Sequence, residues 1–152
     1  MKNVPALVAV LAGLAIVAAC GDDLPKSEFP TGDPLVAFHT MDKSVPAETA
    51  KRVLDRVLTA VPQLKELRAA DAAQAGGQVV LNISLQSGPD PEGMHALERE
   101  CHFVYVNTNG PNGLIHTATF VVKADLSEVQ VFDDTGDAVE PVDVWLKARG
   151  LK

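Results

Sequence analysis

The chain has 152 residues, a formal net charge of −7 and 47% hydrophobic residues, which fits one modest globular domain and excludes a multidomain protein. This hydrophobic content, with 22% charged residues, is not that of a disordered chain. The acidic balance argues against a nucleic-acid partner, because a phosphate-binding surface needs clustered Lys and Arg.

The first residues have the pattern of a secretory signal. Lys2 gives a basic start, residues 3–19 carry no charge, and Cys20 follows directly. The apolar run is shorter than the roughly 18–20 residues that a membrane-spanning helix needs, and Pro5 weakens it further. The sequence therefore predicts a cleaved signal peptide over residues 1–19.

The segment Val17-Ala18-Ala19-Cys20 resembles the bacterial lipobox, in which small residues precede a cysteine that receives diacylglycerol before cleavage. The resemblance implies that Cys20 is the lipidated N-terminus. Its acyl chains would anchor the protein to a membrane of the bacterial cell envelope, facing the periplasm or the exterior. Both the inner and the outer membrane fit, and an ordinary signal peptide with a chance cysteine is the alternative. Without Cys20 only Cys101 remains, so no internal disulfide is expected.

The mature chain divides into a tether and a domain. Residues 20–34 are rich in Pro, Gly and acidic residues without a hydrophobic period, which predicts a lipid-anchored flexible linker. Residues 35–152 are expected to form a single α+β domain. Its first apolar patch, residues 35–38, fits either an edge strand or a segment that docks the linker.

Two helices are expected next. Ser44 suits a helix cap and Pro46 suits a first turn. The apolar residues that follow recur at three- and four-residue spacing and predict one buried face: Ala50, Val53, Leu54, Val57, Leu58 and Val61. A second, alanine-rich helix is expected from Gln63 to about Ala75, before Gly76 and Gly77.

Four later segments alternate apolar and polar residues, the period of strands with one buried face. They are residues 78–86, 98–107, 114–123 and 129–132. The Asn- and Gly-rich residues 107–113 favour an antiparallel hairpin between the second and third segments. In the last segment, residues 139–147, Pro141 suits a helix start and Trp145 is expected to pack on the sheet or on the first helix.

Strands joined by short turns should pair antiparallel, and an amphipathic helix should cover their apolar face. The predicted fold class is therefore α+β. It consists of an amphipathic N-terminal helix packed on a four-stranded antiparallel sheet, with a short C-terminal helix.

Residues 115–133, followed by Pro141-Val-Asp-Val-Trp145, are similar to the C-terminal hairpin of small PepSY-like or cystatin-like envelope lipoproteins. In those proteins a strand turns tightly at an Asp into a strand of the form Glu-Val-x-Val, and an acidic loop and a Trp-bearing tail follow. Here Leu126-Ser127 stands where Thr-Gly is usual. The resemblance implies a helix on an antiparallel sheet and a non-enzymatic, binding or inhibitory role, and it transfers no active-site residue.

The adjacent Cys101 and His102 are the residues most suggestive of a nucleophile and its base. Consecutive strand residues point to opposite faces, so the two side chains are not expected to meet. Cys101 shares its predicted face with Phe103 and Tyr105 and is expected to be a buried thiol. No catalytic residue is therefore assigned.

The remaining histidines do not suggest a metal site. His116 is in phase with Leu114, Ala118 and Phe120, so it is interpreted as a sheet residue, while His39 and His95 lie outside strong patterns. No His-x-x-x-His or Cys-x-x-Cys spacing occurs, and no metal or other cofactor is predicted.

The acidic residues 133–137, Asp-Asp-Thr-Gly-Asp, could offer oxygens to a cation. Their glycine comes fourth, whereas an EF-hand loop needs it sixth, and no Glu falls at the twelfth position. The loop therefore fits calcium poorly.

The favoured function is a membrane-tethered, non-catalytic lipoprotein that binds or inhibits a protein or peptide of the envelope. Asn82, Ser84 and Gln86 on the polar face of the first strand, with the hairpin tip, are the expected contact residues. The alternatives are a metal-binding accessory lipoprotein and a hydrolase without a recognisable motif. A cleft with converging acids or histidines would favour an enzyme, and a flat polar surface would favour binding.

Overall fold

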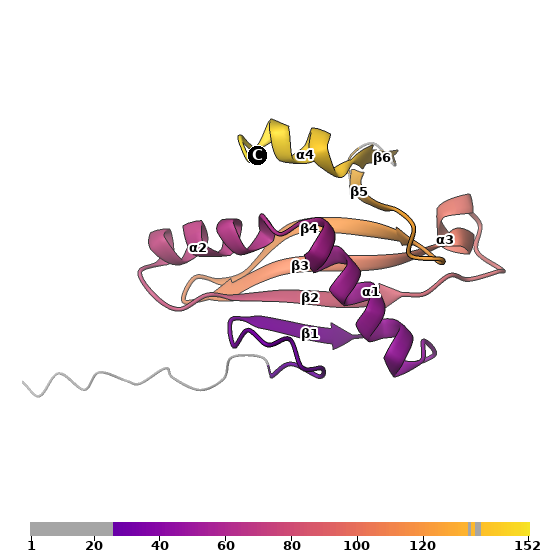
Figure 1. Cartoon of the computed structure of the whole chain (residues 1–152), viewed down its shortest axis with the longest axis horizontal. Coiled ribbons are helices and arrows are strands. Elements are labelled where there is room, and N and C mark those ends of the chain that lie inside the picture. The colour runs from indigo at the N-terminus through magenta and orange to yellow at the C-terminus, as the bar shows by residue number, and fades with distance from the viewer. Residues whose placement is uncertain (1–25, 134, 136–137) are drawn as a thin grey trace, which may run out of the picture.

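A computed structural model describes residues 26–133, 135 and 138–152. The predicted signal peptide, the predicted lipidation site Cys20 and the first part of the predicted linker lie outside these residues. Figure 1 shows the whole arrangement, with the strands stacked from β1 to β6 and the helices α1 and α2 crossing in front of them.

The prediction of a four-stranded antiparallel sheet is wrong. The described residues form an α+β fold with one six-stranded mixed sheet, in which the strands lie in sequence order. The first pair is parallel and every other pair is antiparallel. The strands are β1 (Val36–Thr40), β2 (Val80–Ser87), β3 (Cys101–Gly110), β4 (Gly113–Lys123), β5 (Val129–Asp133) and β6 (Ala138–Pro141).

The two strands that the prediction lacked lie at the two ends of the sheet. In β1, Val36, Ala37 and Phe38 are all buried, so the strand has no alternation from which its type could be recognised. It pairs in parallel with β2, a partner that lies beyond two helices in sequence. β6 spans only Ala138–Pro141 and ends in a proline, which favours the helix-start interpretation over a strand.

The helices follow the prediction more closely. α1 buries Ala50, Val53, Leu54 and Val57, which confirms its predicted buried face. The predicted Ser44 cap is wrong, because the cap residue is Pro46 and the Ser44 hydroxyl donates to Asp42 Oδ1 at 2.6 Å. The helices of the described residues are α1 (Ala47–Ala60), α2 (Leu64–Ala75), the unpredicted α3 (Ala96–Glu100) and α4 (Val142–Ala148).

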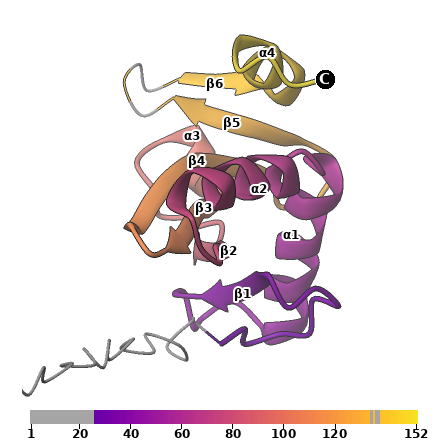
Figure 2. The same ribbon diagram turned by 90° about the vertical axis from the view of Figure 1, so that its left-hand side faces the viewer.

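The core lies between one face of the sheet and the helices α1, α2 and α4 (Figure 2). Phe38, Ile83 and Phe120 are fully buried there. The Trp145 ring lies edge-on to Phe120 with the ring centroids 5.6 Å apart, which confirms that Trp145 packs on the sheet. The opposite face of the sheet carries none of these three helices and is called the open face below.

Residues 26–34 run beside β1. The Glu28 amide donates to the Phe38 carbonyl at 2.8 Å, and the Phe38 amide donates to Ser27 Oγ at 2.8 Å. Asp33 forms an ion pair with Lys65 of α2 at 3.1 Å. The described end of the predicted linker is therefore attached to the outer edge of the sheet.

Candidate binding surface

β4 and β5 separate halfway along the sheet. β4 pairs with β3 over its whole length, from Gly113 to Lys123, but pairs with β5 only over residues 119–122. The ladder between β4 and β5 therefore covers only the second part of β4.

A cleft of about 380 Å³ opens where the two strands separate. We call it the β4–β5 cleft. One wall comes from β4, and the other from β5, β6 and α4. Its lining residues are His116, Thr117, Ala118, Thr119, Val131, Phe132, Asp133, Thr135, Glu140, Trp145 and Arg149.

His116 is the polar centre of the β4 wall. Its Nδ1 lies 2.9 Å from Asn107 Oδ1, and its Nε2 lies 3.3 Å from Thr119 Oγ1. The Tyr105 ring meets the His116 ring edge-on at 5.6 Å. These contacts hold the imidazole in place on the open face.

The predicted phase of His116 is wrong, because a β-bulge interrupts the alternation. Asn107 pairs with His116 while Val106 pairs with Ala118, so Thr117 is an extra residue on β4. His116 consequently lies on the open face, opposite to Ala118 and Phe120. It remains a sheet residue, as expected, but it lines a cleft that the sequence did not predict.

The opposite wall of the cleft contains an aromatic ring, a positively charged guanidinium group and two carboxylates. The Arg149 guanidinium lies over the Trp145 ring, 4.2 Å from its centroid, which is a cation–π arrangement. Asp133 at the end of β5 and Glu140 in β6 supply carboxylates. The cleft therefore offers aromatic surface and charged groups, as binding pockets commonly do.

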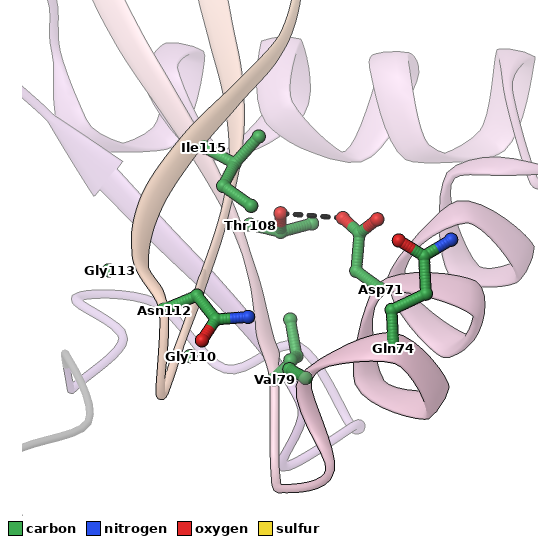
Figure 3. Close-up of a pocket in the computed structure, with 9 residues that line it drawn as sticks. Asp71, Gln74, Val79, Thr108, Gly110, Asn112, Gly113 and Ile115 are labelled. Atoms are coloured by element: carbon green, nitrogen blue, oxygen red, sulfur yellow. Dashed lines mark hydrogen bonds between the residues drawn. The ribbon is translucent and has the colours of Figure 1, made fainter.

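A second, much smaller cavity of about 50 Å³ lies between α2 and the β3–β4 hairpin (Figure 3). Thr108 donates its hydroxyl to Asp71 Oδ2 at 2.7 Å, and Gln74, Gly113 and Ile115 lie around this bond. Its volume suits ordered water and is too small for an organic ligand of ordinary size.

The side chains of Cys101 and His102 lie on opposite faces of the sheet, as alternation predicts. Cys101 is 5% exposed on the open face, and burial raises the pKa of its thiol, which disfavours the reactive thiolate. His102 is 3% exposed on the helix-covered face beside Val104. Desolvation lowers the pKa of His102, only partly opposed by the nearby Asp42 carboxylate.

The predicted contact residues of β2 lie where alternation puts them, on the open face, but they contribute little surface. Asn82 and Ser84 are buried between neighbouring strands, and Gln86 is half-buried and donates to Ser84 Oγ at 2.8 Å. The large exposed side chains near the hairpin are instead Leu114 and Ile115. The point at which two strands stop pairing leaves no signal in composition, so the sequence could not point to the β4–β5 cleft.

No group of three or more His, Cys, Asp or Glu side chains that could hold a metal occurs among the described residues. In the acidic loop, Asp133 Oδ1 accepts hydrogen bonds from the backbone amide and the hydroxyl of Thr135, at 2.9 and 2.7 Å. Asp134, Gly136 and Asp137 lie outside the described part of the chain.

Within residues 26–133, 135 and 138–152, no helix combines the length and the apolar character needed to cross a membrane. Comparisons of the chain with models of protein families, with curated proteins and with solved structures find no match.

Proposed function

We propose that this chain is a membrane-tethered, non-catalytic protein of the bacterial envelope that binds a protein or peptide partner at the β4–β5 cleft. The observation that carries the proposal is the separation of β4 from β5, which leaves a cleft of about 380 Å³ lined by the Trp145 ring, the Arg149 guanidinium and the carboxylates of Asp133 and Glu140. A rigid sheet with an accessible groove is a common basis for recognition.

The tether rests on the lipobox-like residues that end at Cys20. Acyl chains on that residue would hold the domain at a membrane, as the predicted linker over residues 20–34 implies. Replacing Cys20 with Ser is expected to abolish labelling by radioactive fatty acid and to leave unprocessed precursor. Labelling that persists in the variant would contradict the tether.

The binding site can be tested through Trp145, the single tryptophan of the chain, which lines the cleft. Peptides from a displayed random library would be selected on the full chain in detergent micelles and then titrated while Trp145 emission is followed. We expect saturable binding that shifts this emission. Failure of every selected peptide to change it would overturn the proposed function.

A matched pair of variants localises the binding. Thr117→Phe places a ring in the cleft, whereas Thr59→Phe makes the same change at an exposed position of α1. We expect the first variant to weaken binding about tenfold or more and the second to leave it unchanged. Equal affinities for both variants would place the binding surface elsewhere.

A hydrolase is the second candidate, because Thr119, His116 and Asn107 stand in the order of a nucleophile, a base and an orienting group. The burial of Thr119 argues against a hydrolase, because a nucleophile must reach its substrate and this residue is only 3% exposed. The isosteric variant Thr119→Val removes the hydroxyl and is expected to retain peptide binding. Peptide cleavage that this variant abolishes would instead identify a hydrolase.

A further inference from the structure

We propose that His102 is an acid sensor, which releases the segment between β2 and α3 from the rest of the domain when the pH falls. We call this segment, residues 88–95, the strap. The proposal rests on a buried imidazole, on a carboxylate that holds the strap and on a glycine that lies beside both. It concerns a part of the fold other than the β4–β5 cleft and does not depend on the proposed function.

One hydrogen bond joins the strap to a distant part of the described chain. The Gly88 amide donates to Asp42 Oδ2 at 2.9 Å. The other hydrogen bonds of the strap stay within residues 88–99, as does the bond from the Asp90 amide to the Glu98 carbonyl at 2.8 Å. The strap and α3 therefore form a small unit at one end of the sheet (Figure 1), and Asp42 fastens this unit to the domain.

The strap lies close to the domain because residue 88 is a glycine. A Cβ atom at this position would lie 2.6 Å from Val45 Cγ2, which is too short for two carbon atoms that are not bonded. The same point lies 3.7 Å from Asp42 Oδ2 and 3.7 Å from His102 Nδ1. Gly88 is therefore a neighbour of both the carboxylate that holds it and the buried imidazole.

The His102 imidazole is buried beside this contact without a hydrogen bond at Nδ1. The residue is 3% exposed, and its Nδ1 atom has no hydrogen-bond partner among the described residues. On the sheet His102 pairs with the uncharged Val122 of β4, and Asp42 is the one charged group of the described chain that acts on it. A protonated imidazole in this place would carry a buried N–H donor without an acceptor.

Acidification therefore favours a state in which His102 contacts water. Burial lowers the pKa of His102 in the closed state, and the Asp42 carboxylate opposes only part of this effect. An open state, in which the strap has left and the imidazole is hydrated, binds the proton more tightly. A fall in pH thus shifts the population toward the open state.

Asp42 can remain in place while the strap leaves. Its Oδ1 atom accepts hydrogen bonds from the Ser44 amide at 3.0 Å and from the Ser44 hydroxyl at 2.6 Å. These bonds do not involve the strap. When the Gly88 amide leaves Oδ2, the same carboxylate can accept a hydrogen bond from the protonated His102, which favours the open state further.

Amide hydrogen exchange of Gly88 measures this opening, in the full chain in detergent micelles and corrected for the intrinsic exchange rate at each pH. The Val104 amide, in a strand paired on both sides, reports unfolding of the domain. We expect Gly88 to be less protected than Val104 at every pH. Protection of Gly88 should fall by up to about tenfold per pH unit below the ordinary value of 6.5, because one proton is bound on opening.

Two histidine variants show which residue is responsible. His102→Gln removes the titrating group and should make the protection of Gly88 independent of pH between about pH 5 and about pH 7. His95→Gln makes the same change at an exposed position of the strap and should keep the response of the unmodified chain. Gly88→Ala should open the strap at neutral pH and return the pKa of His102, measured by NMR titration, toward its ordinary value.

Several results would overturn the proposal. Equal protection of Gly88 and Val104 would mean that the strap opens only when the whole domain unfolds. A response to pH that persists in His102→Gln, or is absent from the unmodified chain, would exclude His102 as the sensor. Protection of Gly88 that rises on acidification would mean that the protonated imidazole tightens the contact with Asp42 and does not release the strap.

Discussion

Both ends of the sheet combine strands with helices, but they differ in how they are closed. At the β1 end, α1 and α2 connect parallel strands, and residues 26–34 occupy the outer edge (Figures 1 and 2). At the other end, β5 leaves β4 halfway along, and the short elements β6 and α4 form the far wall of a cleft. The first end is closed by the chain itself, whereas the second opens into a cleft.

The largest expected effect is a loss of stability on changing Trp145, which packs α4 against the core. It is 3% exposed and contacts both Phe120 and Arg149. Trp145→Ala should lower the free energy of unfolding by about 3–5 kcal/mol. Val144→Ala, at a neighbouring position that is 48% exposed, is the control and should change it by less than about 0.5 kcal/mol. Thermal unfolding followed by circular dichroism measures both, and similar melting midpoints would contradict the packing of α4.

Two leucines compare the buried core with the exposed β3–β4 hairpin directly. Leu54 in α1 is fully buried, whereas Leu114 in β4 is 65% exposed. Leu54→Ala should cost about 2–5 kcal/mol of stability, and Leu114→Ala less than about 0.5 kcal/mol. If Leu114→Ala destabilised the fold as much as Leu54→Ala, Leu114 could not be the exposed side chain that the structure shows.

A smaller, pH-dependent effect on stability is expected at His102, on the helix-covered face of the sheet. Burial lowers the pKa of His102 in the folded state, so the unfolded chain binds a proton more readily as the pH falls below the ordinary value of 6.5. His102 therefore reduces stability progressively with acidification through this range. His102→Gln should show a shallower loss of stability between about pH 7 and about pH 5 in chemical denaturation. Parallel pH curves for the two proteins would contradict this account.

Asp42, close to His102, affects stability in a separate, lower pH range. Hydrogen bonds from the Ser44 hydroxyl and from the Gly88 amide lower the pKa of its carboxyl. Its stabilising contribution is present above the ordinary value of 3.8 and is lost as the pH falls through the lower folded value. The response of His102 can therefore be measured while Asp42 remains ionised.

The smallest effect is expected at Cys101. Its raised pKa and 5% exposure predict slow alkylation of the native protein. Cys101→Ser should leave peptide affinity unchanged at a temperature where the variant is folded. Rapid native alkylation together with loss of function in this variant would favour a thiol-dependent enzyme over a binding protein.

The sequence predicted those parts of the fold that have a clear hydrophobic period. The α1 face containing Leu54 and Val57 and the alternation of Leu81 and Ile83 in β2 each identified an element and its buried side. β1 lacks such a signal because both of its faces are buried. β6 and α3 are too short to establish a period.

The candidate site was harder to predict because it depends on where pairing stops. Alternation assigned His116 to the wrong face, since the extra residue at Thr117 changes the register without any mark in composition. The β4–β5 cleft follows from the length of the contact between the two strands, which is a tertiary property. Strand segments alone predict a hairpin there, and only the pairing shows that residues 113–118 extend beyond their neighbour.

Amide hydrogen exchange along β4 tests the central claim most directly. Residues 116–119 of β4 line the β4–β5 cleft, whereas α1 contributes no residue to its lining. A selected peptide should slow amide exchange at residues 116–119 and leave the exchange of α1 unchanged. No change at residues 116–119 when the peptide binds would contradict the account.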